Sequence, residues 1–182
     1  GLREFSVDAW LTLEDFGVQA IVGHCRRLRS MTLKGCPQLT DDTISYLASL
    51  QDLEGLYLPS AVQLTDRSLR ELCGAPLVSR LDLSACRNFT DGNVKRLAAS
   101  ATNLHMIRLD QCTQLGPDAA YALASHESLV SCSLSGCERV PTVAQIWGDA
   151  QGKRQAWSRL RELHPHLAEM DSSGGPELDD ND

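Results

Sequence analysis

The sequence predicts an α/β fold, a right-handed solenoid with a curved parallel sheet on its concave side and helices on its outside. Three observations predict it. An apolar pattern recurs about six times at intervals of 25–26 residues. Each copy opens with the strand-like alternation L-x-x-L-x-L and closes with apolar residues at helical spacing. A unit this short cannot bury its own apolar side, so neighbouring units must stack to form one core.

The units follow one another without interruption. They begin at Leu2, Leu28, Leu53, Val78, Leu104 and Leu129. The helical half of three units starts with Thr-Asp, at Thr40, Thr65 and Thr90. A threonine hydroxyl can cap the free N–H groups of a first helical turn, and a carboxylate suits the positive end of the helix dipole. We therefore expect each of these three threonines to cap a helix.

The chain divides into three parts. Residues 1–140 hold the repeats. Residues 141–171 are expected to form a C-terminal cap, with a helical turn or two over 141–147, a helix over 153–163 and a last strand after it. Residues 172–182 are acidic, offer almost nothing to a core, and are expected to be a disordered tail.

The first unit begins at Leu2, with no capping segment before it. An open stack exposes core at its ends unless something covers them. We therefore expect a neighbouring subunit or an upstream segment to cover the N-terminal rung.

The repeat resembles the cysteine-containing leucine-rich repeat, written C-x-x-L-x-x-L-x-L-x-x-C-x-x-[LI]-T-D-x-x-[LI]-x-x-[LA]. The similarity runs from residue 2 to about residue 140. It implies a horseshoe that binds other proteins on its concave face. Members of this family include substrate receptors of SCF-type ubiquitin ligases, in which an F-box precedes the repeats, and assembly factors such as the ATP synthase subunit s-like proteins. No F-box-like segment precedes the repeats in this sequence.

Most of the cysteines occupy positions of the repeat. Four lie three residues after the last strand leucine, where Trp10 and Ala61 stand in the other two units. The resemblance implies that these side chains turn inward after the strand, and Cys25 takes the family's other cysteine position. The cysteines expected to have this structural role are Cys25, Cys36, Cys86, Cys112 and Cys137.

A disulfide or a zinc site is the alternative to packing for these cysteines. Adjacent rungs lie roughly 5 Å apart, so a disulfide between Cys112 and Cys137 is within geometric reach. However, the chain has seven cysteines, an odd number, and no C-x-x-C spacing typical of zinc sites. Buried free cysteine behaves as a small apolar side chain. We expect free thiols and hence an intracellular, reducing compartment: cytoplasm, nucleus or mitochondrial interior.

The sequence shows no pattern typical of catalysis. It has no phosphate-binding loop and no G-x-S-x-G motif, and we expect no catalytic residue, metal site or cofactor. A net charge of −7 argues against nucleic acid as a partner. No apolar stretch is long enough to span a membrane.

The candidate partner-binding residues stand between the leucines of the middle units, where alternation points them to the concave side. They are Tyr57, Arg80, Asp82, Met106, Arg108 and Asp110. Tyrosine and arginine often carry binding energy at interfaces. The alternative is that the charged residues only pair with one another across neighbouring strands.

These observations predict a non-catalytic scaffold that binds other protein subunits within a larger complex. A second hypothesis is the substrate-recognition part of an SCF-type ubiquitin ligase receptor. A third is an enzyme or redox protein that uses a reactive cysteine.

Overall fold

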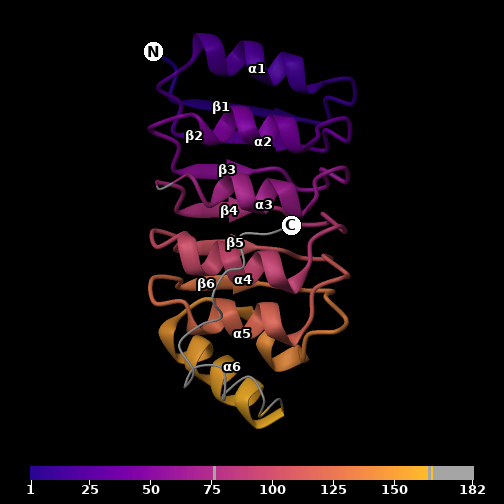
Figure 1. Cartoon of the computed structure of the whole chain (residues 1–182), viewed down its shortest axis with the longest axis vertical. Helices are drawn as coiled ribbons and strands as arrows, with labels where there is room; N and C mark the ends of the chain where they lie inside the picture. The colour runs from indigo at the N-terminus through magenta and orange to yellow at the C-terminus, as the bar shows by residue number, and fades with distance from the viewer. Residues whose placement is uncertain (76, 164, 166–182) are drawn as a thin grey trace, which may run out of the picture.

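Strands and helices alternate along the chain and stack in sequence order into an open α/β solenoid (Figure 1). The computed structural model describes residues 1–75, 77–163 and 165. Within them the strands are β1 (Glu4–Asp8), β2 (Ser30–Lys34), β3 (Gly55–Tyr57), β4 (Arg80–Asp82), β5 (Met106–Arg108), β6 (Ser131–Ser133) and β7 (Ile146–Trp147). The helices are α1 (Asp15–His24), α2 (Asp41–Ala48), α3 (Asp66–Leu72), α4 (Asp91–Ser100), α5 (Pro117–Ser125) and α6 (Ala150–Leu163), with a short 3₁₀ helix, η1 (Thr142–Ala144).

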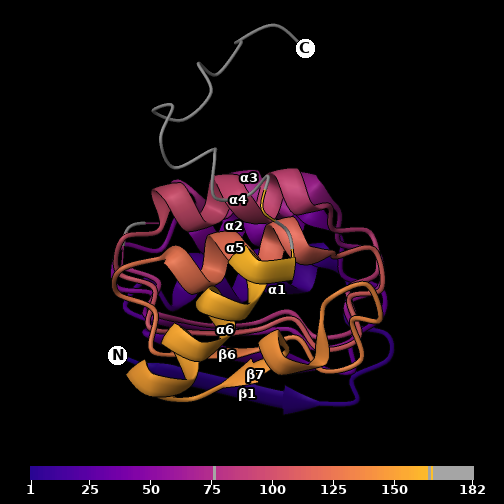
Figure 2. The same cartoon turned by 90° about the horizontal axis from the view of Figure 1, so that it is seen from below.

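The strands form one sheet in the order β1 to β7, and the helices lie along one side of it (Figure 2). The first six strands are parallel, and β7 pairs antiparallel with β6. The exposed side of the sheet, opposite the helices, is called the sheet face below. The predicted fold class is therefore confirmed.

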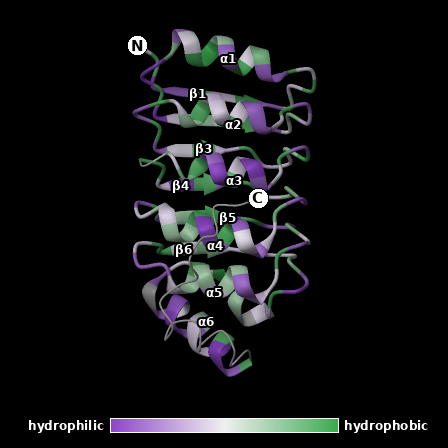
Figure 3. Cartoon of the chain, viewed as in Figure 1, coloured by the Kyte–Doolittle hydropathy of each residue, from purple (hydrophilic) through white to green (hydrophobic). Residues whose placement is uncertain are grey.

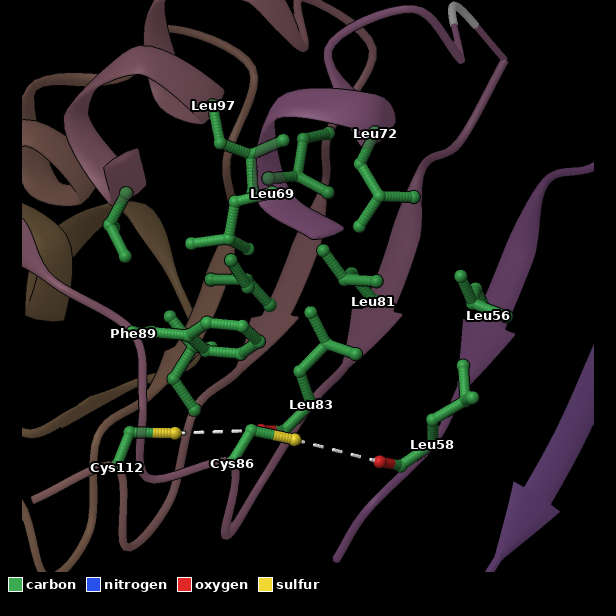
Figure 4. Packing of buried hydrophobic residues seen from close by; sticks show 14 of the residues in the cluster. Leu56, Leu58, Leu69, Leu72, Leu81, Leu83, Cys86, Phe89, Leu97 and Cys112 are labelled. Carbon is green, nitrogen blue, oxygen red and sulfur yellow. Dashed lines mark hydrogen bonds between the residues drawn. The ribbon is translucent and has the colours of Figure 1, made fainter. Parts of the chain in front are cut away.

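One apolar layer runs between the sheet and the helices. The register aligns the middle residues of successive strands, which are Met31, Leu56, Leu81, Ile107 and Cys132. All of them are buried. Each large side chain buried in this way contributes about 1.5–3 kcal/mol, and the layer is continuous from rung to rung (Figure 4). In Figure 3 the helices carry hydrophobic and hydrophilic residues together, as expected when one side packs and the other faces water.

Aspartates join the starts of successive helices. Asp15 accepts hydrogen bonds from the backbone N–H and the hydroxyl of Thr40, at 2.9 and 2.7 Å. Asp66 does the same for Thr90, at 2.9 and 2.6 Å. In the next rung Asp91 accepts from the backbone N–H of Gly116 at 2.7 Å. The solenoid is therefore held along its helical side by charge-assisted hydrogen bonds as well as by apolar packing.

The predicted threonine caps form in two of the three cases. Thr40 and Thr65 accept from the backbone N–H two residues further on, at 3.3 and 3.2 Å. Thr90 makes no such cap within α4, although its hydroxyl donates to Asp66 just as those of Thr40 and Thr65 donate to Asp15 and Asp41. The prediction for Thr90 was therefore wrong.

Two further expectations differ from the structure. Trp10 does not fill the inward position that Ala61 and the cysteines occupy: 46% of its surface is exposed, and β1 is the edge strand of the sheet in the part of the chain that the structure describes. The segment 141–147 forms one helical turn, η1, and then the short strand β7, which was not expected. The helix predicted over 153–163 begins at Ala150. The predicted last strand and the acidic tail lie outside the described residues.

Candidate partner-binding face

The six candidate residues lie on or just after three adjacent strands. Tyr57, Asp82 and Arg108 are aligned across β3, β4 and β5. In the neighbouring column, two positions earlier on each strand, stand Gly55, Arg80 and Met106. Because alternate residues of a strand point to the same side, both columns face away from the buried leucines. The register therefore brings the candidate residues together on the sheet face.

Tyr57 leans over a neighbour in the same strand. A Cβ atom added to Gly55 would lie only 3.1 Å from Cε2 of Tyr57 and 3.3 Å from its hydroxyl oxygen. The absence of a side chain at Gly55 therefore makes room for the tyrosine ring, which is half-buried and remains available at its outer edge.

Arg108 extends between two carboxylates. Its Nε atom lies 3.9 Å from Asp82, and one of its terminal nitrogens lies 3.4 Å from Asp110. The exposed fractions differ sharply: 53% for the Arg108 side chain, against 13% for Asp82 and 19% for Asp110. The cation is therefore displayed to solvent while its two anionic partners are largely covered.

The two carboxylates are also engaged by the protein itself. Asp110 accepts hydrogen bonds from the hydroxyl of Ser133 and, at 2.8 Å, from the backbone N–H of Ser135. Asp82 accepts from the backbone N–H of Ser84 at 3.0 Å. These contacts fix the carboxylates, and through them the position of Arg108.

Arg80 differs from its neighbours. It is exposed, and its side chain has no ion pair or hydrogen bond with any of the residues that the structure describes. Ion pairing within the face therefore accounts for Arg108, Asp82 and Asp110 but not for Arg80.

The repeat cysteines point inward and bond to backbone carbonyls. The thiols of Cys112 and Cys137 donate to the carbonyl oxygens of Leu83 and Leu109, at 3.4 and 3.2 Å, each in the preceding rung (Figure 4 shows the first). Cys86 donates to Ala61 at 3.4 Å and, at 3.9 Å, to Leu58 (Figure 4). Each thiol fills the turn after a strand and satisfies a carbonyl there.

Burial makes these thiols hard to ionise. It raises the pKa of Cys86 to about 12 and that of Cys137 to about 11, and it raises the pKa of Cys112 as well. All seven cysteines are free, and five are fully buried, while Cys25 and Cys73 are half-buried. A nucleophilic cysteine needs a lowered pKa and access to solvent, and these five thiols have neither.

A polar contact that the repeat pattern did not reveal holds the C-terminal helix. Lys153 of α6 donates to the backbone carbonyls of His126 and, at 3.0 Å, of Leu129. The His126 ring bonds the Ala101 carbonyl at 3.0 Å and accepts from the Leu129 N–H at 3.1 Å. Lys153 lies beyond the repeats, and His126 stands three residues before Leu129, the repeat position that Cys25 holds before Leu28, so the periodic signal places His126 but not its contact with Lys153.

The outer end of the first rung exposes several large apolar side chains. They are Leu2, Trp10, Leu11 and Phe16. Among the described residues no cluster of His, Cys, Asp or Glu has metal-binding geometry. In the same part of the chain, no helix has the length and apolar character needed to span a membrane.

Comparison with known proteins indicates a leucine-rich-repeat-like protein. The chain is 31% identical over 116 residues to "Antagonist of mitotic exit network protein 1" of Eremothecium gossypii, a match covering 62% of this chain and 29% of that protein. It is 29% identical over 109 residues to "F-box/LRR-repeat protein 4" of Bos taurus, covering 57% and 18% respectively. The chain thus spans less than a third of either relative. No family model matches it.

A solved structure agrees on the fold. The crystal structure of the yeast Rad7 and Elc1 complex matches 79% of this chain and 53% of the chain compared, with a TM-score of 0.55 and 15% sequence identity. At that identity the likeness shows the solenoid architecture and nothing more specific. Together, the repeat register and these similarities define the chain as a leucine-rich-repeat-like solenoid.

Proposed function

We propose that this chain is a non-catalytic protein-binding solenoid, a stable subunit or assembly factor of a larger complex, and that it binds its partner through the sheet face. The observation that carries the proposal is a group of four residues on three adjacent strands: Tyr57, Arg80, Met106 and Arg108. The two arginines of this group are exposed cations. Aromatic and arginine side chains supply much of the binding energy at protein interfaces.

The buried cysteines support the same assignment. Their thiols serve as packing groups in the turn after each strand, and their raised pKa values oppose a role as nucleophiles. Free thiols in this number also support residence in a reducing, intracellular compartment.

The second candidate function is the substrate-recognition part of an SCF-type ubiquitin ligase receptor. The similarity to F-box/LRR-repeat protein 4 favours it. A receptor of this kind would use the same face for its substrate. Co-purification of a cullin and its adaptor with the full-length natural protein would favour the receptor, whereas other stable subunits without a cullin would favour the scaffold.

Affinity capture with variant chains tests the sheet face. Tyr57→Ala and Arg108→Ala are expected to weaken capture of the main partner without lowering the melting temperature. The matched control is Arg96→Ala, because Arg96 is exposed on α4, on the opposite side of the solenoid. Capture unchanged by both sheet-face variants, or weakened equally by the control, would reject the assignment.

A further inference from the structure

In the centre of the sheet face the basic side chains are exposed to solvent, whereas the acidic side chains are largely buried. Asp82 and Asp110 equal Arg80 and Arg108 in number, yet both carboxylates are largely buried and both arginine side chains are exposed. A partner approaching the centre of this face, over β4 and β5, therefore meets two cations first. The chain as a whole carries a net charge of −7, so this region contrasts with the rest of the molecule.

Neither guanidinium is saturated by the protein. Arg80 has no side-chain partner among the described residues. Arg108 makes one long hydrogen bond, 3.4 Å to Asp110, and a looser contact to Asp82 at 3.9 Å. A guanidinium offers five N–H donors arranged to grip a carboxylate, so most of the donors of this pair are available to a partner.

The spacing of the pair suits an extended peptide. Arg80 of β4 is aligned with Met106 of β5. Arg108 lies two residues after Met106 on β5, so the two arginines are diagonal neighbours. With strands about 4.8 Å apart and alternate residues about 6.6 Å apart, their Cα atoms lie about 8 Å from each other. Two acidic side chains at alternate positions of an extended segment are separated by a similar distance, about 6.6 Å.

The two aligned columns of β3, β4 and β5 are called the central grid below, and apolar groups occupy some of its other positions. Met106 lies beside Arg80, and Tyr57 lies on the far side of Asp82 from Arg108, with its ring over Gly55. Small hydroxyl residues flank the grid in the next rungs, namely Ser30 and Thr32 on one side and Ser131 and Ser133 on the other. The central grid is therefore the only part of these aligned strand positions that offers both charge and apolar area.

We propose that the sheet face binds an extended acidic peptide segment of its protein partner, with carboxylates on Arg80 and Arg108 and an apolar side chain against Tyr57 or Met106. This inference rests on the proposed function, since it specifies the partner of the same face. Complementary charge supplies the specificity, because the two guanidinium groups are exposed to solvent while the carboxylates of Asp82 and Asp110 are largely buried.

Selection from a displayed library of short random peptides on the immobilised chain tests the proposal. The expected pool is enriched in Asp and Glu near an apolar residue, and its members lose affinity at high salt. Arg80→Glu should weaken binding of the selected peptides by about tenfold or more, and Arg80→Lys should weaken it less. Arg96→Glu on α4, the same change of charge on the helical side, should leave binding unchanged.

The outcomes separate this inference from the function it rests on. A pool that requires Tyr57 but shows no acidic enrichment would overturn the acidic partner and leave the sheet face as the binding site. Peptides that bind all sheet-face variants as well as the unaltered chain, or a library that yields no binder, would overturn both. Arg80-dependent binding of a fluorescent single-stranded oligonucleotide in preference to the peptides would overturn the assignment to a peptide. Urea unfolding verifies that Arg80→Glu, which removes no hydrogen bond or ion pair with the described residues, stays folded.

Discussion

The carboxylate of Asp41 accepts hydrogen bonds from both the backbone N–H and the hydroxyl of Thr65, at 2.8 and 2.6 Å, although the two residues belong to different repeats. The same carboxylate also accepts from the backbone N–H of Ser68, at 3.2 Å, and from its hydroxyl. The start of α2 is thereby tied to the start of α3. The Thr-Asp pair of the repeat thus links neighbouring units, in addition to its role within a single helix.

Replacing this carboxylate should weaken the whole stack. Asp41→Asn keeps the size but removes the charge and turns an amide group toward hydrogen-bond donors. We expect it to lower the free energy of unfolding by about 2–3 kcal/mol, because hydrogen bonds to charged groups are worth about 1.5–3 kcal/mol each and are not additive. Urea unfolding at neutral pH measures the loss. The adjacent variant Asp42→Asn, which removes only an exposed ion pair with Arg67, should cost less than about 1 kcal/mol.

The aspartates also predict how stability depends on pH. Burial raises the pKa of Asp15 and Asp41, but the hydrogen bonds from their threonine and serine partners outweigh it and leave the pKa below the ordinary value of 3.8. Such groups stabilise the fold above the unfolded-state pKa, and this contribution is lost as the pH falls through the lower folded-state pKa. Asp41→Asn should therefore flatten the loss of stability in acid, measured by urea midpoints from about pH 6 to about pH 2.5.

Asp91 provides a contrast of opposite sign. Burial raises its pKa, and the one backbone hydrogen bond from Gly116 does not offset this. The folded state then binds a proton before the unfolded state does, so this group adds stability as the pH falls. Asp91→Asn should make the loss of stability in acid steeper, whereas Asp41→Asn should make it shallower. The same dependence of stability on pH in both variants would contradict the hydrogen-bond assignment.

His126 predicts a second pH effect, near neutrality. Burial lowers its pKa below the ordinary 6.5, and its Nδ1 atom serves as an acceptor for the Leu129 N–H, which requires the neutral ring. As the pH falls through about 6.5, the unfolded chain is protonated first and stability is lost. Thermal unfolding at about pH 8 and about pH 5.5 should show this loss in the unaltered chain and a smaller one in His126→Asn.

The turn after each strand predicts the effect of glycine substitutions. The residue just before the inward position has a positive φ in every unit, and it is glycine at Gly35 and Gly136, with φ of 64° and 75°. Gly136→Ala should cost about 1–2 kcal/mol, because a Cβ is disfavoured in this left-handed conformation. Gly92→Ala in α4, where a Cβ meets nothing within 4 Å, should instead stabilise by about 0.5–1 kcal/mol in the same unfolding assay. Equal effects at the two sites would contradict the described turn geometry.

Much of this architecture could be predicted from the sequence because the repeat supplies the register. Aligning Leu56 with Leu81 on a repeat interval of 25 residues also aligns Tyr57 with Asp82, so the composition of the sheet face follows from the alignment. The parallel sheet and the order of its strands follow from the same alignment, and the resemblance to the cysteine-containing repeat implies the inward cysteines.

Contacts that break the periodicity could not be predicted in this way. Trp10 stands at the position that is buried in the other five units, yet 46% of its surface is exposed, so the repeat pattern alone does not give its exposure. Lys153 lies beyond the repeats, so the repeat pattern does not specify its hydrogen bonds to the loop after α5. The unequal exposure of Arg108 and Asp82 depends on side-chain conformations, and a residue pattern does not specify those.

The described packing predicts which thiols react. Five of the seven cysteines are fully buried, and burial raises the pKa of Cys86 to about 12, so the reactive thiolate is scarce and shielded. Cys25 and Cys73 are only half-buried and should react first. A redox or catalytic role would require at least one of the five buried thiols to react before Cys25 and Cys73.

The measurement that tests the account most directly is a time course of thiol alkylation on the native chain, with each cysteine followed by mass spectrometry. The account predicts that Cys25 and Cys73 are modified early, that Cys36, Cys86, Cys112, Cys132 and Cys137 stay protected, and that all seven react at similar rates in denaturant. Rapid native modification of Cys86 or Cys112, in the centre of the stack, would contradict a solenoid that buries its cysteines as packing groups.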